Sequence, residues 1–330
     1  MPLFCLVLFL QLSTLIPFIH HPEPQLQESR TFHEFSFKPI KSLESDSIYQ
    51  PGIIRAVDEF YYVLDYSPYS RVLKLNKITG EIITVYGKQW GRGPGDTENL
   101  TDFAVSKNGN VWAADPSNAR LTIFNQDGDP KTIILHKDLP YKLSGDLYVN
   151  YVALSNLGST KTFLIDEDEN ILWESDELTE NPLIWNNIVL GFLLLLDNHE
   201  VIKIGNYAGY IIRYNEKGSA VYNRRTIAHK HDPIGDPVRG ADELIYNVDR
   251  RKMDHAVANG YIFDDKLVLF VQHMGDDRFQ SLDVYDLIEG TYLYSYRLPE
   301  SFRDLDITQE GRIVGIKPEG KILVWETPGF

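Results

Sequence analysis

The stretch "NGNVWAADPSNARLTIFNQDG" at residues 108–128 contains two short apolar segments separated by a polar loop. Asn108-Gly109 is a typical hairpin turn, and both VWAAD and LTIF have the composition and alternation of β-strands. A second tight turn, NQDG, ends the stretch. Two strands of this length do not stay folded alone in water, so they must pack within a larger β structure.

The second strand and its turn recur along the chain. Each copy is an apolar alternating strand that ends at Asn or Asp, a turn with Gly or Asn, and another alternating strand. The copies are VLKLNKITGEIITVY (72–86), LTIFNQDGDPKTIIL (121–135), TFLIDEDENILWES (162–175), YIIRYNEKGSAVYNR (210–224), SLDVYDLIEGTYLYSY (281–296) and a shortened KILVWE (321–326). A period of about 40–50 residues is typical of a radial array of repeats.

A further hairpin precedes these copies, as in FAVSKNGNVWAAD (103–115) and LDITQEGRIVGI (305–316). Four strands per unit are typical of a propeller blade, so we expect an all-β, six-bladed β-propeller that forms a single domain over residues 32–330. The last unit lacks its outer strand. We expect the N-terminal FHEFSFKPI (32–40) to pair there and close the ring, because an open propeller exposes two sheet edges.

One unit carries a family resemblance. The segment YGKQWGRGPGDTENLTDFAVSKNGNVWAADPSNARLTIFNQDG (86–128) resembles an NHL repeat, with a Gly-Pro-Gly loop, an Asn-Gly turn and an Asp-x-x-Asn-x-Arg segment formed by Asp115, Asn118 and Arg120. The whole chain is similar by its period to the six-bladed, NHL-like propellers of exported bacterial proteins. That resemblance implies a binding module, a sensor or an enzyme, so the fold alone leaves the function open.

The net charge and the N-terminal residues limit the class of partner and the cellular location. A net charge of −15 argues against a nucleic-acid partner. The uncharged, apolar start makes residues 1–21 a signal-like or anchor segment, although it lacks a basic leading region and a small-residue cleavage site. We expect an exported, periplasmic or extracellular monomer that meets a membrane only if this segment is retained. Cys5 is the only cysteine, so no intramolecular disulfide can form.

Ligands of propellers usually bind where the loops between blades meet the loops that join second and third strands. The long polar insertion 228–255, between blades four and five, belongs to the same face, and such insertions are often functional. We expect the ligand-binding face to comprise Asp65, Tyr66, Trp90, Arg92, Asp115, Asn118, Tyr207, His229, His231, Arg239, His273 and Arg278.

Two segments contain residues that bind metals elsewhere. His229 and His231 point the same way on an extended chain, and with His255 and His273 they are candidate zinc ligands, although solvated histidines are the plainer interpretation. Asp166, Asp168, Asn170, Glu174 and Glu177 match calcium-loop positions, but Ile171 replaces the required glycine and favours a hairpin turn. We expect no cofactor, with zinc or calcium as the alternatives.

Two classes of function remain. The first is a binding or sensing module for a protein, peptide or glycan, and the second is a metal-assisted lyase or hydrolase with an axial site. No set of acid, base and metal ligands recurs across the units, so we assign no catalytic residue and favour the binding module.

Overall fold

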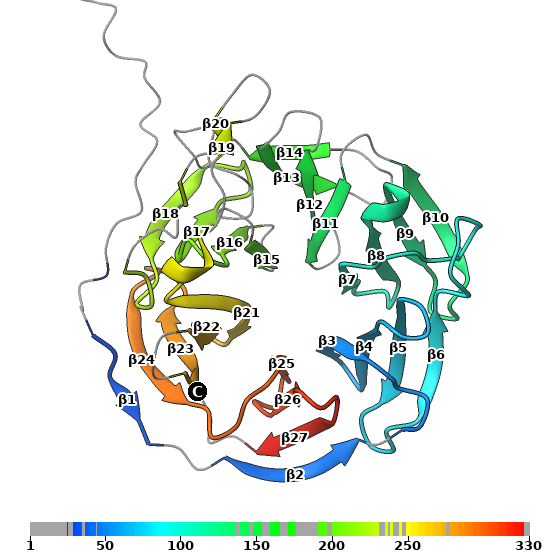
Figure 1. Ribbon diagram of the computed structural model, residues 1–330, viewed down its shortest axis with the longest axis horizontal. Coiled ribbons are helices and arrows are strands. Elements are labelled where there is room, and N and C mark those ends of the chain that lie inside the picture. Colours follow the sequence, from blue (N-terminus) through cyan, green and yellow to red (C-terminus); the bar gives the residue numbers. More distant parts are fainter. Residues whose placement is uncertain are drawn as a thin grey trace, which may run out of the picture.

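The computed structural model shows β-sheets arranged as a ring around a central axis (Figure 1). It describes residues 25, 29–34, 37–43, 45–135, 139–144, 148–153, 159–165, 171–175, 191–196, 200–230, 235–236, 238–239, 244–245, 249–274 and 278–326. Consecutive strands of each sheet run antiparallel, from an inner strand near the axis to an outer strand at the rim. The prediction of an all-β propeller built from four-stranded blades is confirmed.

The first half of the chain forms three sheets. Sheet 1 contains β3 (Pro51–Val57), β4 (Phe60–Asp65), β5 (Arg71–Asn76) and β6 (Ile82–Tyr86). Sheet 2 contains β7 (Asp102–Val105), β8 (Val111–Asp115), the 3-10 turn η1 (Pro116–Asn118), β9 (Arg120–Phe124) and β10 (Pro130–Leu135). Sheet 3 contains β11 (Leu139–Ser144), β12 (Tyr148–Ala153), β13 (Ser159–Ile165) and β14 (Ile171–Ser175). Ile165 pairs with Ile171 across an antiparallel ladder, and of the suggested calcium ligands only Glu174 is among the described residues.

The second half forms three more. Sheet 4 contains β15 (Gly191–Leu195), β16 (Val201–Gly205), β17 (Tyr210–Tyr214) and β18 (Ala220–Arg225). Sheet 5 contains β21 (His255–Phe263), β22 (Lys266–His273), β23 (Gln280–Asp286), β24 (Tyr292–Arg297) and the N-terminal β1 (Phe32–His33). Sheet 6 contains β25 (Asp304–Ile307), β26 (Ile313–Ile316), β27 (Ile322–Glu326) and β2 (Lys38–Leu43). Within the described residues, sheets 1 to 4 and sheet 6 each have the expected four strands. Sheet 5 has a fifth strand, β1.

Successive sheets pack face to face, which is why the opening hairpin is stable. Tyr86 of sheet 1 and Phe124 of sheet 2 are fully buried, and their ring centroids lie 6.0 Å apart. Val63 and Val314 belong to one buried cluster that joins sheets 1 and 6. Alternate residues of the middle strands therefore face the sheet before and the sheet after their own. Both faces of each sheet must for this reason be apolar.

Gly128 shows how a turn residue meets the next sheet. Its φ of 90° is favourable only for glycine, as predicted for the second tight turn of the opening stretch. A methyl group on Gly128 would lie 2.7 Å from the carbonyl oxygen of Val85 in β6. The turn of sheet 2 therefore packs directly on the outer strand of sheet 1.

The N-terminal segment does not pair as one strand. Phe32 and His33 pair in parallel with Ser295 and Tyr296 of sheet 5. The strand beside β27 is Lys38–Leu43, which begins six residues after the start of the predicted segment 32–40. The predicted boundaries were therefore wrong, because the segment crosses from the rim of sheet 5 to that of sheet 6 (Figure 1).

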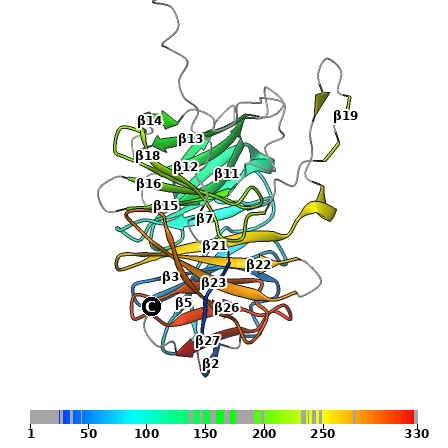
Figure 2. The ribbon, with the colours of Figure 1, turned by 90° about the vertical axis from the view of Figure 1, so that its left-hand side faces the viewer.

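The insertion between sheets 4 and 5 projects from the ring (Figure 2). It contains the two-stranded ribbon β19 (Val238–Arg239) and β20 (Leu244–Ile245) and the short 3-10 turn η2 (Arg250–Lys252). In the strand order it follows β18 and precedes β21. In the described part of the chain, no helix has the length and apolarity needed to cross a bilayer. Residues 1–21, taken as signal-like or anchor, lie outside the described residues.

Candidate functional site

The connectors between sheets and the loops between second and third strands emerge at the same end of the sheets, because the strands of each sheet alternate in direction. We call this end the loop face. It includes the loops β4–β5, β8–β9, β16–β17 and β22–β23, and the connectors that precede β3, β7 and β21.

Asp115 and Asn118 hold the connector that leads into sheet 2. Asp115 is fully buried at the end of β8, and its carboxylate accepts hydrogen bonds from the backbone N–H groups of Glu98 (2.9 Å) and Asn99 (3.1 Å). The Asn118 amide donates to the same carboxylate at 2.7 Å and to the Gly91 carbonyl at 3.0 Å. These two predicted ligand-binding residues therefore attach the loop face to the sheet.

Arg120 completes this arrangement. Its guanidinium donates to the carbonyl oxygens of Arg92 (3.1 Å), Gly93 (3.3 Å) and Asp96. The side chain is 4% exposed, so it stabilises the connector from the buried side. The Asp-x-x-Asn-x-Arg segment thus has a structural role at every one of its three polar positions.

Sheet 1 repeats the arrangement with Asp65 and Arg71. Asp65 accepts hydrogen bonds from the backbone N–H groups of Gln50 (2.6 Å) and Tyr49 (3.4 Å), and Arg71 Nη2 donates to Asp65 at 3.0 Å. The Arg71 guanidinium also lies 5.7 Å from the Tyr49 ring centroid and 5.6 Å from that of Tyr69. The ion pair therefore fixes two aromatic rings on the loop face.

The exposed side chains of this face include aromatic and basic ones. Trp90 is 68% exposed and Tyr49 61%, and the Arg92 side chain is 82% exposed, with Glu98 at 3.8 Å. Arg278 is exposed on the loop that precedes β23, while Tyr66 and Tyr207 are half-buried. Tyr49 was not predicted from the sequence, because it precedes the first strand and matches no repeat position.

His273 belongs to a buried polar network in sheet 5. Its Nε2 lies 3.0 Å from Ser281 Oγ, and Ser281 donates to Asp283 at 2.8 Å. Arg30 from the N-terminal segment binds the same carboxylate through Nε (3.1 and 3.2 Å) and Nη2 (2.8 Å). Ser281 and Asp283 are fully buried, whereas His273 is half-buried at the edge of the network.

His255 and His229 lie beside this network. His255 pairs with His273 across β21 and β22, and its ring is perpendicular to that of His229, with centroids 6.4 Å apart. Burial, together with the nearby His229 and His273, lowers the pKa of His255 to about 3. Burial also lowers the pKa of His273 to about 4. Both imidazoles are therefore neutral at pH 7.

Among the described residues, no three or more His, Cys, Asp and Glu side chains are arranged to hold a metal ion. His231 lies outside the described residues, and Arg239 is placed only by its backbone in β19. The four candidate zinc ligands are thus only partly tested, and three of them, His229, His255 and His273, do lie near one another.

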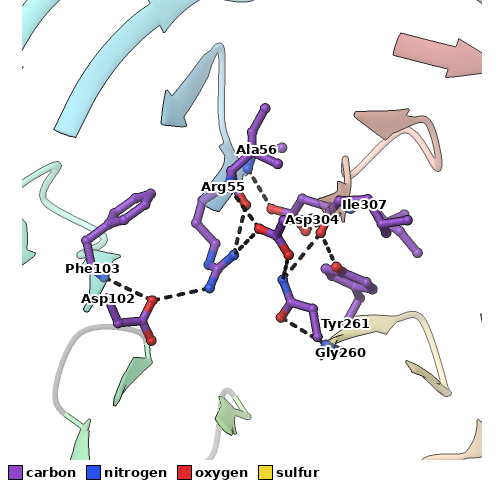
Figure 3. Close-up of polar contacts among 12 residues, drawn as sticks. Arg55, Ala56, Asp102, Phe103, Gly260, Tyr261, Asp304 and Ile307 are labelled. Atoms are coloured by element: carbon purple, nitrogen blue, oxygen red, sulfur yellow. Dashed lines mark hydrogen bonds and ion pairs between the residues drawn. The ribbon is translucent and has the colours of Figure 1, made fainter. Parts of the chain in front are cut away.

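A second polar cluster, not found from the sequence, lies on the inner strands (Figure 3). Arg55 of β3 reaches Asp102 of β7 and Asp304 of β25, each at 3.4 Å. Asp304 also accepts hydrogen bonds from the Ile54 N–H (2.9 Å) and from Asn259 Nδ2 of β21 (3.1 Å). The cluster links the inner strands of four sheets.

The acids of this axial cluster bind backbone groups of the next sheet. Asp102 accepts a hydrogen bond from the Leu143 N–H of β11 at 3.1 Å, and Asp306 accepts one from the Ala56 N–H at 2.6 Å. Burial raises the pKa of Asp306 to about 6, partly offset by Arg55. The only sequence signal was a charged residue within an inner strand, as in "DLDI" and "IIRAV". We interpret the cluster as structural.

Comparison with known proteins supports the architecture. No family model and no curated protein sequence matches the chain. A member of the DUF4221 family from Bacteroides vulgatus is similar in structure, with a TM-score of 0.61 and 9% identity, covering 90% of this chain and 99% of that one. A Bacteroides fragilis protein described as exported has a TM-score of 0.57 and 14% identity, covering 92% and 98%.

The WD40 repeats of RRP9 also match, with a TM-score of 0.53 and 11% identity, covering 89% of this chain and all of that one. At such low identities, these likenesses show a shared fold alone. The chain is therefore a β-propeller by its structure and by its neighbours.

Proposed function

We propose that this protein is an exported binding module that recognises a protein partner through its loop face. The similarity to propellers that include a protein described as exported and a WD40 protein supports this proposal. A peptide or a glycan would use the same face, and the experiment below distinguishes them by what is captured. The insertion 228–255 extends this face, and the protein acts as a monomer.

Trp90 carries the proposal. Large exposed aromatic rings and arginines are enriched at the energetically important positions of interfaces. The Trp90 segment is rigid, because Thr97 N–H donates to Gln89 at 2.9 Å and Lys88 N–H donates to Gly95 at 2.8 Å. A tryptophan on a backbone that is already ordered loses little backbone freedom on binding, which favours affinity.

We also propose that the ring has six blades and that β2 closes it. The antiparallel pairing of β2 with β27 supports closure by an N-terminal strand. The relation of sheet 2 to the NHL repeat belongs to the same proposal, supported by the contacts of Asp115, Asn118 and Arg120. Removing residues 1–43 should expose the edge of β27 and lower the melting temperature strongly; an unchanged melting temperature would contradict closure.

A photo-crosslinking experiment tests the binding face. We would place p-benzoylphenylalanine at position 90 in the full chain and irradiate it in the native cell envelope and secreted fractions. The matched control is position 78, since Ile78 is 78% exposed but lies in the β5–β6 turn at the opposite end of sheet 1. The proposal expects a protein adduct specific to position 90 that excess unmodified protein displaces.

Equal adducts at both positions, or none at position 90, would contradict the proposal. A glycan-bearing adduct without protein would favour the glycan instead. As the competitor, unmodified protein with Trp90→Ala should then fail to displace the adduct, although its melting temperature is unchanged.

A further inference from the structure

The junction between sheets 4 and 5 brings together the two ends of the insertion. Thr226 directly follows β18, and His255 opens β21. The β16–β17 turn lies between them: Thr226 N–H donates to the Gly209 carbonyl at 2.8 Å, and Val257 N–H donates to the Asn206 carbonyl at 2.8 Å. The two ends are therefore held by one turn of sheet 4.

Two buried polar atoms at this junction have no hydrogen-bond partner in the part of the chain that is described. They are Thr226 Oγ1 and His255 Nε2, on side chains of residues that are each 2% exposed. Asn206 Oδ1, in the same turn, is also buried and unpartnered there. Native proteins seldom leave such atoms unsatisfied, so each one calls for a physical explanation.

The two atoms face the same space. Gly209 has a φ of +56°, and a methyl carbon on its Cα would lie 2.8 Å from Thr226 Oγ1 and 2.9 Å from His255 Nε2. His229 Cβ is also 2.9 Å from that point. Thr226 Oγ1 and His255 Nε2 thus converge beside the Gly209 backbone, with a second imidazole next to them, so closely that any side chain at position 209 would force them to move.

The atom types indicate the kind of ligand. An imidazole nitrogen with neutral oxygen donors suits divalent transition metals, whereas calcium requires six or more oxygens. The neutral form of histidine is the one that binds metals. The nearby His229 can supply a second nitrogen.

We propose that a divalent transition-metal ion of the zinc class binds between His255, His229 and Thr226 and clamps the two ends of the insertion together. A clamp at the base of a long loop reduces the entropy that the loop loses when it is ordered. The metal thereby positions the insertion on the loop face. This proposal concerns how the insertion is held, and it does not depend on the identity of any partner.

Metal binding to the purified full chain tests the proposal. After treatment with a chelator and desalting, the protein would be titrated with Zn²⁺ by calorimetry and with Co²⁺ by visible absorption. We expect one equivalent of Zn²⁺ with micromolar or tighter affinity, a Co²⁺ spectrum typical of nitrogen and oxygen ligands, and a higher melting temperature with Zn²⁺. Absence of uptake of either ion at 100-fold excess would overturn the proposal.

Variants locate the site. His255→Ala and His229→Ala should each weaken Zn²⁺ binding at least tenfold, whereas His33→Ala, which removes an exposed histidine stacked on Tyr294 in sheet 5, should not. Should His255→Ala fail to fold, the half-buried His229 provides the same test. Unaltered affinity in His229→Ala, or equal loss in His33→Ala, would contradict the assignment.

Gly209→Ala gives an independent test, because its methyl group would lie within 3 Å of both Thr226 Oγ1 and His255 Nε2 and would push these two ligand atoms out of place. Gly320→Ala is the matched control: Gly320 also has a positive φ, +91°, but a methyl group there meets only Pro51 at 3.6 Å. We expect Zn²⁺ binding to be lost in Gly209→Ala and retained in Gly320→Ala. Retention in both, or a crystal structure with an ordinary water molecule on Thr226 and His255 in the presence of Zn²⁺, would overturn the proposal.

Discussion

The junction between sheets 1 and 2 and the junction between sheets 4 and 5 are built alike but satisfied differently. At the first, Asp115 and Arg120 bind the backbone of the incoming connector through several hydrogen bonds. At the second, Thr226 Oγ1 and His255 Nε2 are buried without a hydrogen-bond partner among the described residues. The connector at the first junction is fixed by the chain itself, whereas the base of the insertion presents atoms suited to an added ligand.

Sheet 5 provides an intermediate case. Asp283 is buried like Asp115, but its arginine comes from the N-terminal segment, 253 residues away in sequence, instead of from the next strand. The same physical requirement, a partner for a buried carboxylate, is thus met locally in sheet 2 and by a distant segment in sheet 5.

The largest expected effect is at the first junction. Asp115→Ala removes the acceptor of two backbone N–H groups and leaves Arg120 buried without its carboxylate. We expect a loss of about 3–5 kcal/mol in the free energy of unfolding, measured by urea denaturation. Asp127→Ala, at an exposed position of the same sheet, is the control and should change it by less than about 0.5 kcal/mol. A similar small change for both variants would show that the connector is not held by Asp115.

Arg30→Ala tests the distant partner in sheet 5. It leaves the Asp283 carboxylate buried with only Ser281 and Ser295 as donors, so we expect a loss of about 2–4 kcal/mol in urea denaturation. A double-mutant cycle with Asp283→Asn should recover much of this loss, because the buried charge is then absent. If the two substitutions are additive, the ion pair does not hold the N-terminal segment.

The pH dependence of stability tests a third way of burying a carboxylate, at the axial cluster. Burial raises the pKa of Asp306 to about 6 in the folded protein, above its ordinary value near 3.8. The folded state therefore binds this proton more tightly, which stabilises it below about pH 4, and the stabilisation is lost as the pH rises through 6.

Compared with a protein that lacks this carboxyl group, the free energy of unfolding changes by at most about 2–3 kcal/mol over this pH range. Asp306→Asn should lack this component when urea denaturation is repeated from pH 4 to pH 7. The same slope in both proteins would indicate that Asp306 ionises normally in the folded state.

The smallest expected effect on stability compares one buried threonine hydroxyl at each of the two junctions. In the presence of a chelator, Thr226→Val should change the free energy of unfolding by less than about 0.5 kcal/mol, since its hydroxyl makes no hydrogen bond among the described residues. Thr97→Val, which removes a buried hydroxyl that donates to the Ser70 carbonyl, should cost about 1–2 kcal/mol. Equal costs would mean that the two junctions are satisfied to the same extent.

Much of the fold could be predicted because strand alternation and turn residues act locally. The paired segments around Asn125–Gly128 and Asp286–Gly290 are hairpins as expected, with Gly128 and Gly290 at positive φ. The division of the N-terminal segment between two sheets could not be predicted, because Phe32 and Lys38 choose their partners by contacts made only when the ring assembles.

The candidate site divides in the same way. Trp90 and Arg92 are exposed on a connector, as a polar, glycine-rich loop indicates. The roles of Asp65 and Asp115 were not evident, because a carboxylate at a strand end has the same sequence pattern whether it binds a ligand or a neighbouring connector. Arg55 and Asp304 carry no repeat signal, and they meet only because two inner strands from opposite ends of the chain lie side by side.

The amino-acid sequence by itself determined the β structure, the hairpin positions and the repeating unit, since period-two alternation and turn conformations depend on neighbours a few residues apart. Only the tertiary structure decided which polar residues are satisfied and by what. Arg30 binds Asp283, and the His255 ring packs against that of His229, through contacts between segments that the chain brings together on folding. Burial there removes the water that would otherwise satisfy these groups.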